Sequence, residues 1–169
     1  MNLLSGDLAI QGSYAYVAQQ AWIMNETVAN NITFGVNVDS ERLDRVVDSC
    51  GLLEDIQALP GGLQAEIGER GVNLSGGQKQ RISIARAVYS ERDVYLMDDP
   101  LSAVDYSVGA HIFRHCFRGM LESKTVLFVS HQIHVSGRFL NPNLPSAGLS
   151  VRQLSSLFFL SIWSNVTTL

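Results

Sequence analysis

Two short apolar runs constrain the fold of this chain more than any other feature of its sequence. Val94–Met97 and Thr125–Val129 lack the regular alternation of apolar and polar residues that a half-exposed strand shows, so they predict strands buried in a parallel sheet. Between them, apolar residues recur at helical spacing from Val108 to Met120. Strand, helix and strand over this distance predict a unit whose two strands lie parallel, and the fold class that follows is α/β.

Both strands are followed by side chains that could bind a ligand. Asp98 and Asp99 come directly after the first strand, and Ser130 and His131 after the second. The carboxyl ends of the strands form the ligand-binding edge of an open α/β sheet, and adjacent carboxylates there are costly unless a cation or hydrogen-bond donors meet them. The residues alone leave two interpretations open, a cation site or a simple cap where the strand enters a turn.

A second pattern predicts a helix that begins at an anion site. Ser75 and Gln78 have the spacing of a capping box, in which each side chain bonds to a backbone N–H of the other residue. Gly76 and Gly77 are poor helix formers, yet apolar residues at helical spacing follow from Ile82 onward. Glycines at a helix N-terminus let phosphate oxygens approach backbone N–H groups, and the helix dipole favours the negative charge. Phosphate binding is therefore indicated, with a capped surface helix as the alternative.

The segment Leu74–Arg81 resembles the signature sequence of ATP-binding-cassette (ABC) ATPases. The similarity runs from about Gly6 to about His134, with motifs in the order and spacing of that family. It implies that residues 1–135 form a partial P-loop NTPase-type (ABC ATPase) domain. In such a domain a parallel core sheet is joined to a helical subdomain that contains the signature motif.

The segment from Gln19 to Gly35 is similar to the Gln-loop region of the multidrug-resistance-associated (C) subfamily of ABC exporters. Asp99 stands where most active sites of the family have Glu, and Asp is typical of the N-terminal nucleotide-binding domain of C-subfamily transporters. The resemblance therefore implies ATP hydrolysis coupled to transmembrane transport, at the cytoplasmic face of a membrane. It implies ATP and Mg²⁺ as cofactors. The partners it implies are the transmembrane domains and a second nucleotide-binding domain placed head to tail.

The same resemblance assigns roles to single residues. Asp98 is expected to hold Mg²⁺, and Asp99 is expected to act as the catalytic carboxylate that polarises the attacking water. His131 is expected to contact the γ-phosphate as the switch residue. Gln19 is expected to touch Mg²⁺ or the attacking water, so it is both a catalytic and a metal-binding candidate. The residues expected to face the nucleotide held by a partner domain are Leu74, Ser75, Gly76, Gly77, Gln78 and Asp105.

Two features depart from the family pattern. The sequence contains no Gly-x-x-x-x-Gly-Lys-[Ser/Thr] motif, the phosphate-cradling P-loop, because neither Lys79 nor Lys124 follows a glycine. The chain begins where a full domain would have passed this motif, so we expect it to contribute a signature face to a site built on a partner's P-loop. From Ser136 onward Ser, Asn, Pro and Leu dominate, and residues 136–169 are interpreted as a divergent apolar tail, with disorder as one possibility.

Composition narrows the alternatives. A net charge of −4 gives no reason to expect nonspecific nucleic-acid binding, and no stretch reaches the roughly 18 apolar residues of a membrane span. The ABC-type ATPases of DNA repair remain a second class, although no heptad repeat of their coiled coil is present. A third class is a non-catalytic half-site that binds a partner domain and has no ATP affinity of its own.

Several smaller expectations concern local structure. Leu8–Val17 predicts two short strands, and Ser40–Leu59 predicts one helical segment with Leu53 among its core-facing residues. Cys50 and Cys116 fall at apolar helical positions and are expected to be buried thiols rather than a disulfide. The histidines without metal-binding spacing, which are expected at the surface, are His111, His115 and His134.

Overall fold

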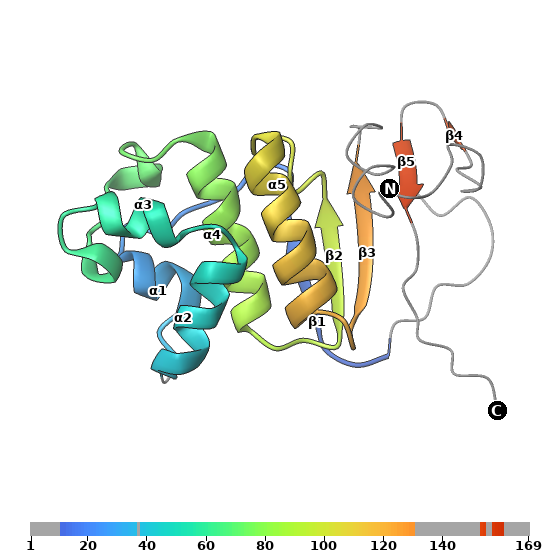
Figure 1. The fold of residues 1–169 in the computed structure, drawn as a ribbon, viewed down its shortest axis with the longest axis horizontal. Coiled ribbons are helices and arrows are strands. Elements are labelled where there is room, and N and C mark those ends of the chain that lie inside the picture. Colours follow the sequence, from blue (N-terminus) through green and yellow to red (C-terminus); the bar gives the residue numbers. More distant parts are fainter. Residues whose placement is uncertain (1–10, 37, 131–152, 155–156, 161–169) are drawn as a thin grey trace.

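The computed structural model contains a sheet with helices gathered to one side of it (Figure 1). It describes residues 11–36, 38–130, 153–154 and 157–160. The first of the two strands expected before Val17 and the residues His131 and His134 lie outside this part of the chain. No helix in the described residues combines the length and apolar character needed to cross a membrane.

Three strands of the sheet are parallel, as the apolar runs predict. β1 (Tyr14–Val17) pairs with β2 (Val94–Asp98), which pairs with β3 (Thr125–Ser130). In this register Tyr16 lies beside Leu96, and Leu96 lies beside Leu127. The α/β class and the parallel strand–helix–strand unit are therefore confirmed.

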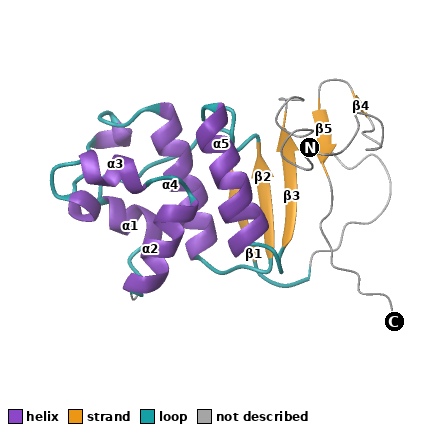
Figure 2. Ribbon diagram, in the orientation of Figure 1, coloured by secondary structure: helices purple, strands orange, loops and turns teal. Residues whose placement is uncertain are grey.

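In the described part of the chain, five α-helices and three tighter or wider helical segments lie to one side of the sheet (Figure 2). The chain passes from α5 directly into a π-helix, so the predicted helix between β2 and β3 is present in two parts. The segments are α1 (Val28–Thr33), α2 (Ser40–Ser49), α3 (Leu53–Ala58), the 3₁₀ turns Gly62–Gln64 and Glu69–Gly71, α4 (Gly76–Tyr89), α5 (Tyr106–Ile112) and the π-helix Phe113–Met120.

The starts of four helices follow from their capping side chains. The side chains of Thr27, Asp39, Ser75 and Asp105 precede α1, α2, α4 and α5, and each accepts a hydrogen bond from a backbone N–H in the first turn. Such caps satisfy N–H groups that have no acceptor inside the helix. Local sequence thus fixes where these helices begin.

The segment Ser40–Leu59 forms two helices, so the prediction of one helix is wrong. Gly51 adopts a left-handed φ of 65° between them, a conformation that glycine takes without a steric cost. The break shifts the helical phase, so Leu52 is buried at 1% exposure whereas Leu53 is 46% exposed. Leu53 therefore does not face the core as expected.

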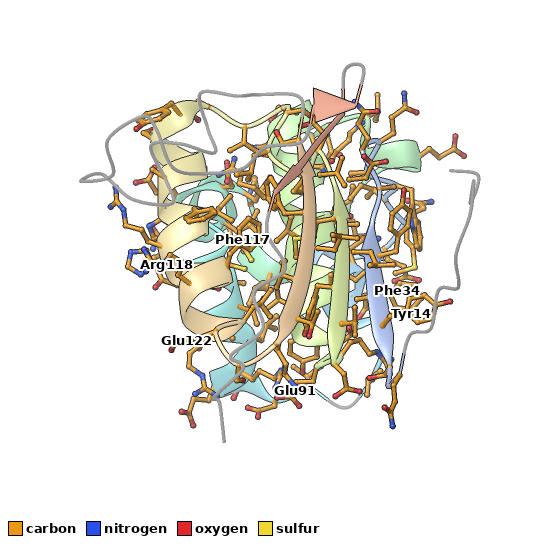
Figure 3. All side chains as sticks on the ribbon, turned by 90° about the vertical axis from the view of Figure 1, so that its right-hand side faces the viewer. Tyr14, Phe34, Glu91, Phe117, Arg118 and Glu122 are labelled. Carbon is orange, nitrogen blue, oxygen red and sulfur yellow. The ribbon has the colours of Figure 1, made fainter. Side chains whose placement is uncertain are left out.

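The core lies between the helices and one face of the sheet. Val17, Tyr95 and Met97 are at most 2% exposed on this face, whereas Tyr14 and Tyr16 on the opposite face are 62% and 59% exposed. This alternation is the period of two that a strand imposes on its side chains. The labelled Phe117 lies between the helix and the sheet (Figure 3), with its ring centroid 5.6 Å from that of Phe128.

Two short strands near the C-terminus extend the sheet, which the sequence did not predict. β5 (Leu157–Leu160) pairs antiparallel with β3, and β4 (Gln153–Leu154) pairs antiparallel with β5. The strand order is therefore β1-β2-β3-β5-β4. The interpretation of residues 136–169 as a divergent tail stays a prediction, but the segment contributes strands to the sheet.

Candidate functional site

Residues 74–77, called the signature loop below, lead into α4 through a complete capping box. The Ser75 hydroxyl oxygen accepts the Gln78 backbone N–H at 3.2 Å, and the Gln78 side-chain oxygen accepts the Ser75 backbone N–H at 2.8 Å. Gly76 and Gly77 are the first two residues of the helix, where N–H groups have no intrahelical acceptor. Ser75 and Gly76 are exposed, so this helix start could bind an anion from solvent.

The structure gives Gly77 a packing role that the sequence did not indicate. A Cβ atom at Gly77 would lie 2.8 Å from the carbonyl oxygen of Ala103, closer than a real Cβ atom approaches another heavy atom without a bond. A Cβ at Gly76 would lie an ordinary 3.8 Å from Ala103 Cβ. Gly77 therefore makes room for the segment after β2 and not only for a phosphate, and it brings the signature loop against residues 101–105.

Two side chains of α4 connect the signature loop to α3. The Gln78 amide donates to Asp55 Oδ1 at 2.9 Å, and Arg81 forms an ion pair with Asp55 Oδ2 at 2.8 Å. Arg81 also donates to the carbonyl oxygen of Gly51, at the break between α2 and α3. Leu74 is buried at 9% exposure, so its side chain belongs to the core that supports the loop.

Asp98 and Asp99 end β2 in different environments. Asp98 is half-buried, and the Tyr16 hydroxyl donates to its Oδ2 across 3.4 Å. Asp99 is 4% exposed, and its Oδ1 accepts the Ser130 hydroxyl from β3 at 3.1 Å. The parallel strands thus bring the carboxylates and Ser130 to one sheet edge. His131, the next residue, lies outside the described part of the chain.

The backbone at Asp99 has a left-handed φ of 46°, which is uncommon for residues other than glycine. Its N–H donates to the Val129 carbonyl at 2.7 Å, and its carbonyl accepts the Ser102 N–H at 3.1 Å. These bonds hold Asp99 where the chain leaves the sheet and turns sharply. Residues held in this region cluster at functional sites, although Phe34 and Glu91 adopt it here as well.

Gln19 is exposed in a bend two residues beyond β1. The preceding residue is anchored from α4, because the Gln80 amide donates to the Ala18 carbonyl at 3.2 Å. Gln80 is 2% exposed, and sequence reasoning gave it no role of its own. The available signal was its spacing, because Gln80 precedes the buried Ile84 by four residues and so lies on the same helix face.

Asp105 is exposed and caps α5 directly after the segment that contacts Gly77. Its Oδ1 accepts the Ser107 hydroxyl at 2.7 Å and the N–H groups of Ser107 and Val108 at 3.1 Å each. The hydrogen bond from the Ser107 hydroxyl, followed by that from the Val108 N–H, lowers the pKa of the Asp105 carboxyl. Asp105 is therefore a fixed anion beside the signature loop.

Arg86 is a half-buried cation of α4 that the sequence analysis did not single out. Its guanidinium donates to the Asn31 carbonyl at 2.6 Å, to Asn31 Oδ1 at 3.1 Å and to the Trp22 carbonyl at 3.1 Å. It lies 4.3 Å from the Trp22 ring centroid and 5.5 Å from that of Phe34. Burial lowers the pKa of Arg86 to about 10.

The Arg86 cluster borders a groove of about 930 Å³. Tyr14 and Phe34, which both line it, lie on the same side of the molecule (Figure 3). Trp22 and Phe34 are each 53% exposed. Asp98 and Asp99 do not line the groove, but Tyr16 does, and its hydroxyl donates to Asp98.

The residues at the sheet edge fit a Mg²⁺–nucleotide complex. No cluster of three metal-ligating His, Cys, Asp or Glu residues exists among the residues described, but Mg²⁺ commonly takes one or two carboxylates and completes its shell with phosphates and water. Asp98 is half-buried, and the Tyr16 hydroxyl contacts one of its oxygens at 3.4 Å, so its carboxylate could hold such an ion. Ser75 and Gly76 could bind the phosphate oxygens of a second nucleotide, one held by another domain.

A parallel sheet with carboxylates at its C-terminal edge, beside a capped helix that begins with glycines, is the arrangement of a nucleotide-binding α/β domain. Residues 7–102 match the family model described as ABC transporter. The chain belongs to the ABC transporter family.

The similar proteins are C-subfamily members of very different organisms. The chain is 58% identical over 134 residues to ABC transporter C family member 12 of Dictyostelium discoideum, and the alignment covers 79% of this chain and 10% of that protein. It is 53% identical over 136 residues to ATP-binding cassette sub-family C member 2 of Homo sapiens, covering 79% and 9%. It is 50% identical over 130 residues to ABC transporter C family member 9 of Arabidopsis thaliana, covering 77% and 9%. The chain thus spans about a tenth of the length of these relatives.

Proposed function

We propose that this chain is part of the ATP-binding and ATP-hydrolysing domain of an ABC-type exporter, in which ATP hydrolysis drives transport across a membrane. The domain would act at the cytoplasmic face, bound to transmembrane domains and to a second nucleotide-binding domain placed head to tail. The similarity to C-subfamily transporters supports this proposal. The contact of the signature loop with residues 101–105 is the observation that carries it.

We infer two nucleotide-binding faces on the domain, which the short segment of residues 101–105 connects. On one face, Ser75 and the N-terminal N–H groups of α4 would bind phosphate oxygens of a nucleotide held by the partner domain. On the other, Asp98 and Asp99 lie at the sheet edge. Gly77 packs on Ala103, and this contact would transmit movement at one face to the other through residues 101–105.

The catalytic roles follow from the sheet edge. Mg²⁺, when bound, would neutralise phosphate charge during attack by water. Asp98 would hold this ion, and Asp99 would orient the attacking water with the carboxylate oxygen that Ser130 does not occupy. Gln19 and His131 would complete the site from the chain after β1 and after β3. Since the sequence contains no P-loop motif, the proposal assigns to this chain only these groups and the signature face.

The test is calorimetric titration of Mg²⁺–ATP into the purified chain, alone and mixed with a P-loop-containing nucleotide-binding domain of a C-subfamily transporter. We expect the mixture to bind more tightly than that domain alone. Ser75→Arg should abolish the gain, because its side chain would fill the anion site. Ser123→Arg is the matched control, since Ser123 is exposed near the opposite end of β3.

The outcomes separate the proposal from its alternative, a non-catalytic interaction fragment. A gain that is lost in Ser75→Arg and kept in Ser123→Arg supports a signature half-site. If the mixture forms a complex without any change in ATP affinity, the fragment is a non-catalytic binding partner and the proposal is wrong. Tight Mg²⁺–ATP binding by the chain alone would contradict the proposal that its signature face completes a site on a partner domain.

A further inference from the structure

Cys50 and Cys116 form a buried pair of thiols. Their sulfur atoms lie 4.0 Å apart, and both residues are 0% exposed. Cys50 ends α2, and Cys116 lies in the π-helix that continues α5. Both are free thiols in the structure, as the sequence predicted, but nothing in the sequence indicated that they would meet.

We propose that Cys50 and Cys116 form a reversible intramolecular disulfide under oxidising conditions, which joins the end of α2 to the π-helix. A disulfide needs the sulfurs at about 2.0 Å, so they must approach by roughly half of their present separation. Cys50 lies at the break between α2 and α3, next to Gly51. The link would therefore form at a point where the backbone already leaves the helical path.

The position of this pair makes the link a means of rigidifying the support of the signature loop. On one side, His111 Nε2 lies 2.7 Å from the Asp48 carbonyl oxygen, which already ties α5 to the end of α2. On the other side, Arg81 of α4 bonds to the Gly51 carbonyl and to Asp55. Since Asp55 also bonds Gln78 of the capping box, a covalent link at Cys50 acts on the structure behind the loop.

The chemistry balances with a disulfide as the oxidant. One cysteine thiolate attacks glutathione disulfide and releases one glutathione, and the second cysteine thiolate then displaces the other glutathione. Two thiols lose two protons and two electrons, and the oxidant is reduced to two thiols. The hydrogen bond with Cys50 and the burial of the thiol raise the pKa of Cys116. Thiolate is therefore scarce at neutral pH, and the link should form faster as pH rises.

The test uses the full chain and diamide, a thiol-selective azo oxidant that takes up two hydrogens and avoids oxidation of the nearby Met120. We expect the intact mass to fall by two hydrogens, both free thiols to disappear, and a single peptide pair to be linked through Cys50 and Cys116. Dithiothreitol should restore both thiols. Glutathione disulfide should give the same link, with a mixed disulfide as its intermediate.

Cys50→Ser and Cys116→Ser are matched controls that each keep one buried thiol. Neither should lose two hydrogens within one chain. Thiols that stay unreacted in the folded chain, or links that form only between chains, would overturn the proposal. Peptide mapping of the wild-type chain shows directly whether Cys50 and Cys116 are linked. The test therefore remains valid even if a variant does not fold.

Thermal unfolding distinguishes a native link from one trapped in a disordered state. The link closes a loop between residues 50 and 116, which restricts the unfolded chain. We expect diamide to raise the Tm of the wild-type chain and to leave the Tm of Cys116→Ser unchanged. A linked chain with a lower Tm would contradict a disulfide compatible with this fold. This inference does not depend on ATP binding, so its outcome is independent of the proposed function.

Discussion

Arg86 joins three segments through a single guanidinium group. It extends from α4, bonds to Asn31 of α1 and to the Trp22 carbonyl, and lies over the rings of Trp22 and Phe34. Burial makes its charge costly, which is why its pKa is lowered to about 10. The charged hydrogen bonds and ring contacts offset this cost.

Replacement of Arg86 is therefore expected to destabilise the fold. Arg86→Ala should reduce the free energy of unfolding by about 2–4 kcal/mol, because it removes the guanidinium donor from the Asn31 carbonyl and from Asn31 Oδ1, which keeps the Met24 N–H. Arg86→Lys should lose much of the same stability, since an ammonium group cannot reproduce the planar fork. Urea unfolding measures both. Arg92→Ala, at an exposed position, should change stability by less than about 0.5 kcal/mol, and an equal loss there would contradict a specific role for Arg86.

Asp93 fixes the start of β2 to the segment before β1. Its Oδ2 accepts the Ser13 N–H at 2.8 Å and the Ser13 hydroxyl at 2.7 Å. These two bonds, from the backbone N–H first, lower the pKa of the Asp93 carboxyl. The charged form is thus favoured in the folded chain.

The expected pH dependence follows from the direction of that shift. A carboxyl whose pKa is lower in the folded state adds stability above its unfolded pKa, near roughly 4, and loses it as pH falls through the folded pKa. Unfolding midpoints between pH 7 and pH 2 should therefore show Asp93→Asn less stable than wild type at neutral pH. The difference should shrink in acid. A constant difference across this range would mean that the charge of Asp93 does not contribute.

At the scale of elements, the start of α4 depends on two glycines with different roles. The Gly77→Ala change should destabilise the chain by about 1–3 kcal/mol, because the new Cβ would meet the Ala103 carbonyl at 2.8 Å. Gly76→Ala meets only an ordinary contact at 3.8 Å, so it should be neutral or stabilise by less than about 1 kcal/mol. Thermal unfolding of the matched pair measures the difference. Equal effects would contradict the packing of α4 on residues 101–105.

The elements divide into those that local sequence specifies and those that it does not. The capping box at Ser75 and Gln78 and the apolar runs of β2 and β3 are local patterns, and each gave the correct element. The break at Gly51 was missed because the apolar spacing continues across it. The strand β5 was missed because its pairing with β3 is a long-range contact that its composition does not reveal.

The candidate site was predictable to the same extent. The chain order of Asp98 and Asp99 after a strand predicted their place at the sheet edge, and the structure puts them there. The sequence could not predict that Ser130 bonds to Asp99, that Ala103 fills the space at Gly77, or that Gln80 anchors Ala18. Each of these contacts joins residues whose proximity depends on the tertiary fold.

At the scale of the whole molecule, the helices lie to one side of the sheet (Figure 1). The candidate groups stand at the start of α4 and at the end of β2. α4 contacts β1 on one side and packs against residues 101–105 at its start. The same helix bonds to the end of α2, to α1 and to the chain before Gln19. α4 is therefore the element that positions both proposed nucleotide-binding faces.

The most direct measurement of this account is amide hydrogen exchange at Gly76 and Gly77. The chain would be measured alone, with Mg²⁺–ATP, with a P-loop-containing nucleotide-binding domain, and with both. The account predicts slower exchange at these two amides only when nucleotide and partner domain are present together, and no such protection in Ser75→Arg. Unchanged exchange at Gly76 and Gly77 in the complete mixture, under conditions where the two proteins associate, would contradict the claim that the start of α4 binds the partner's nucleotide.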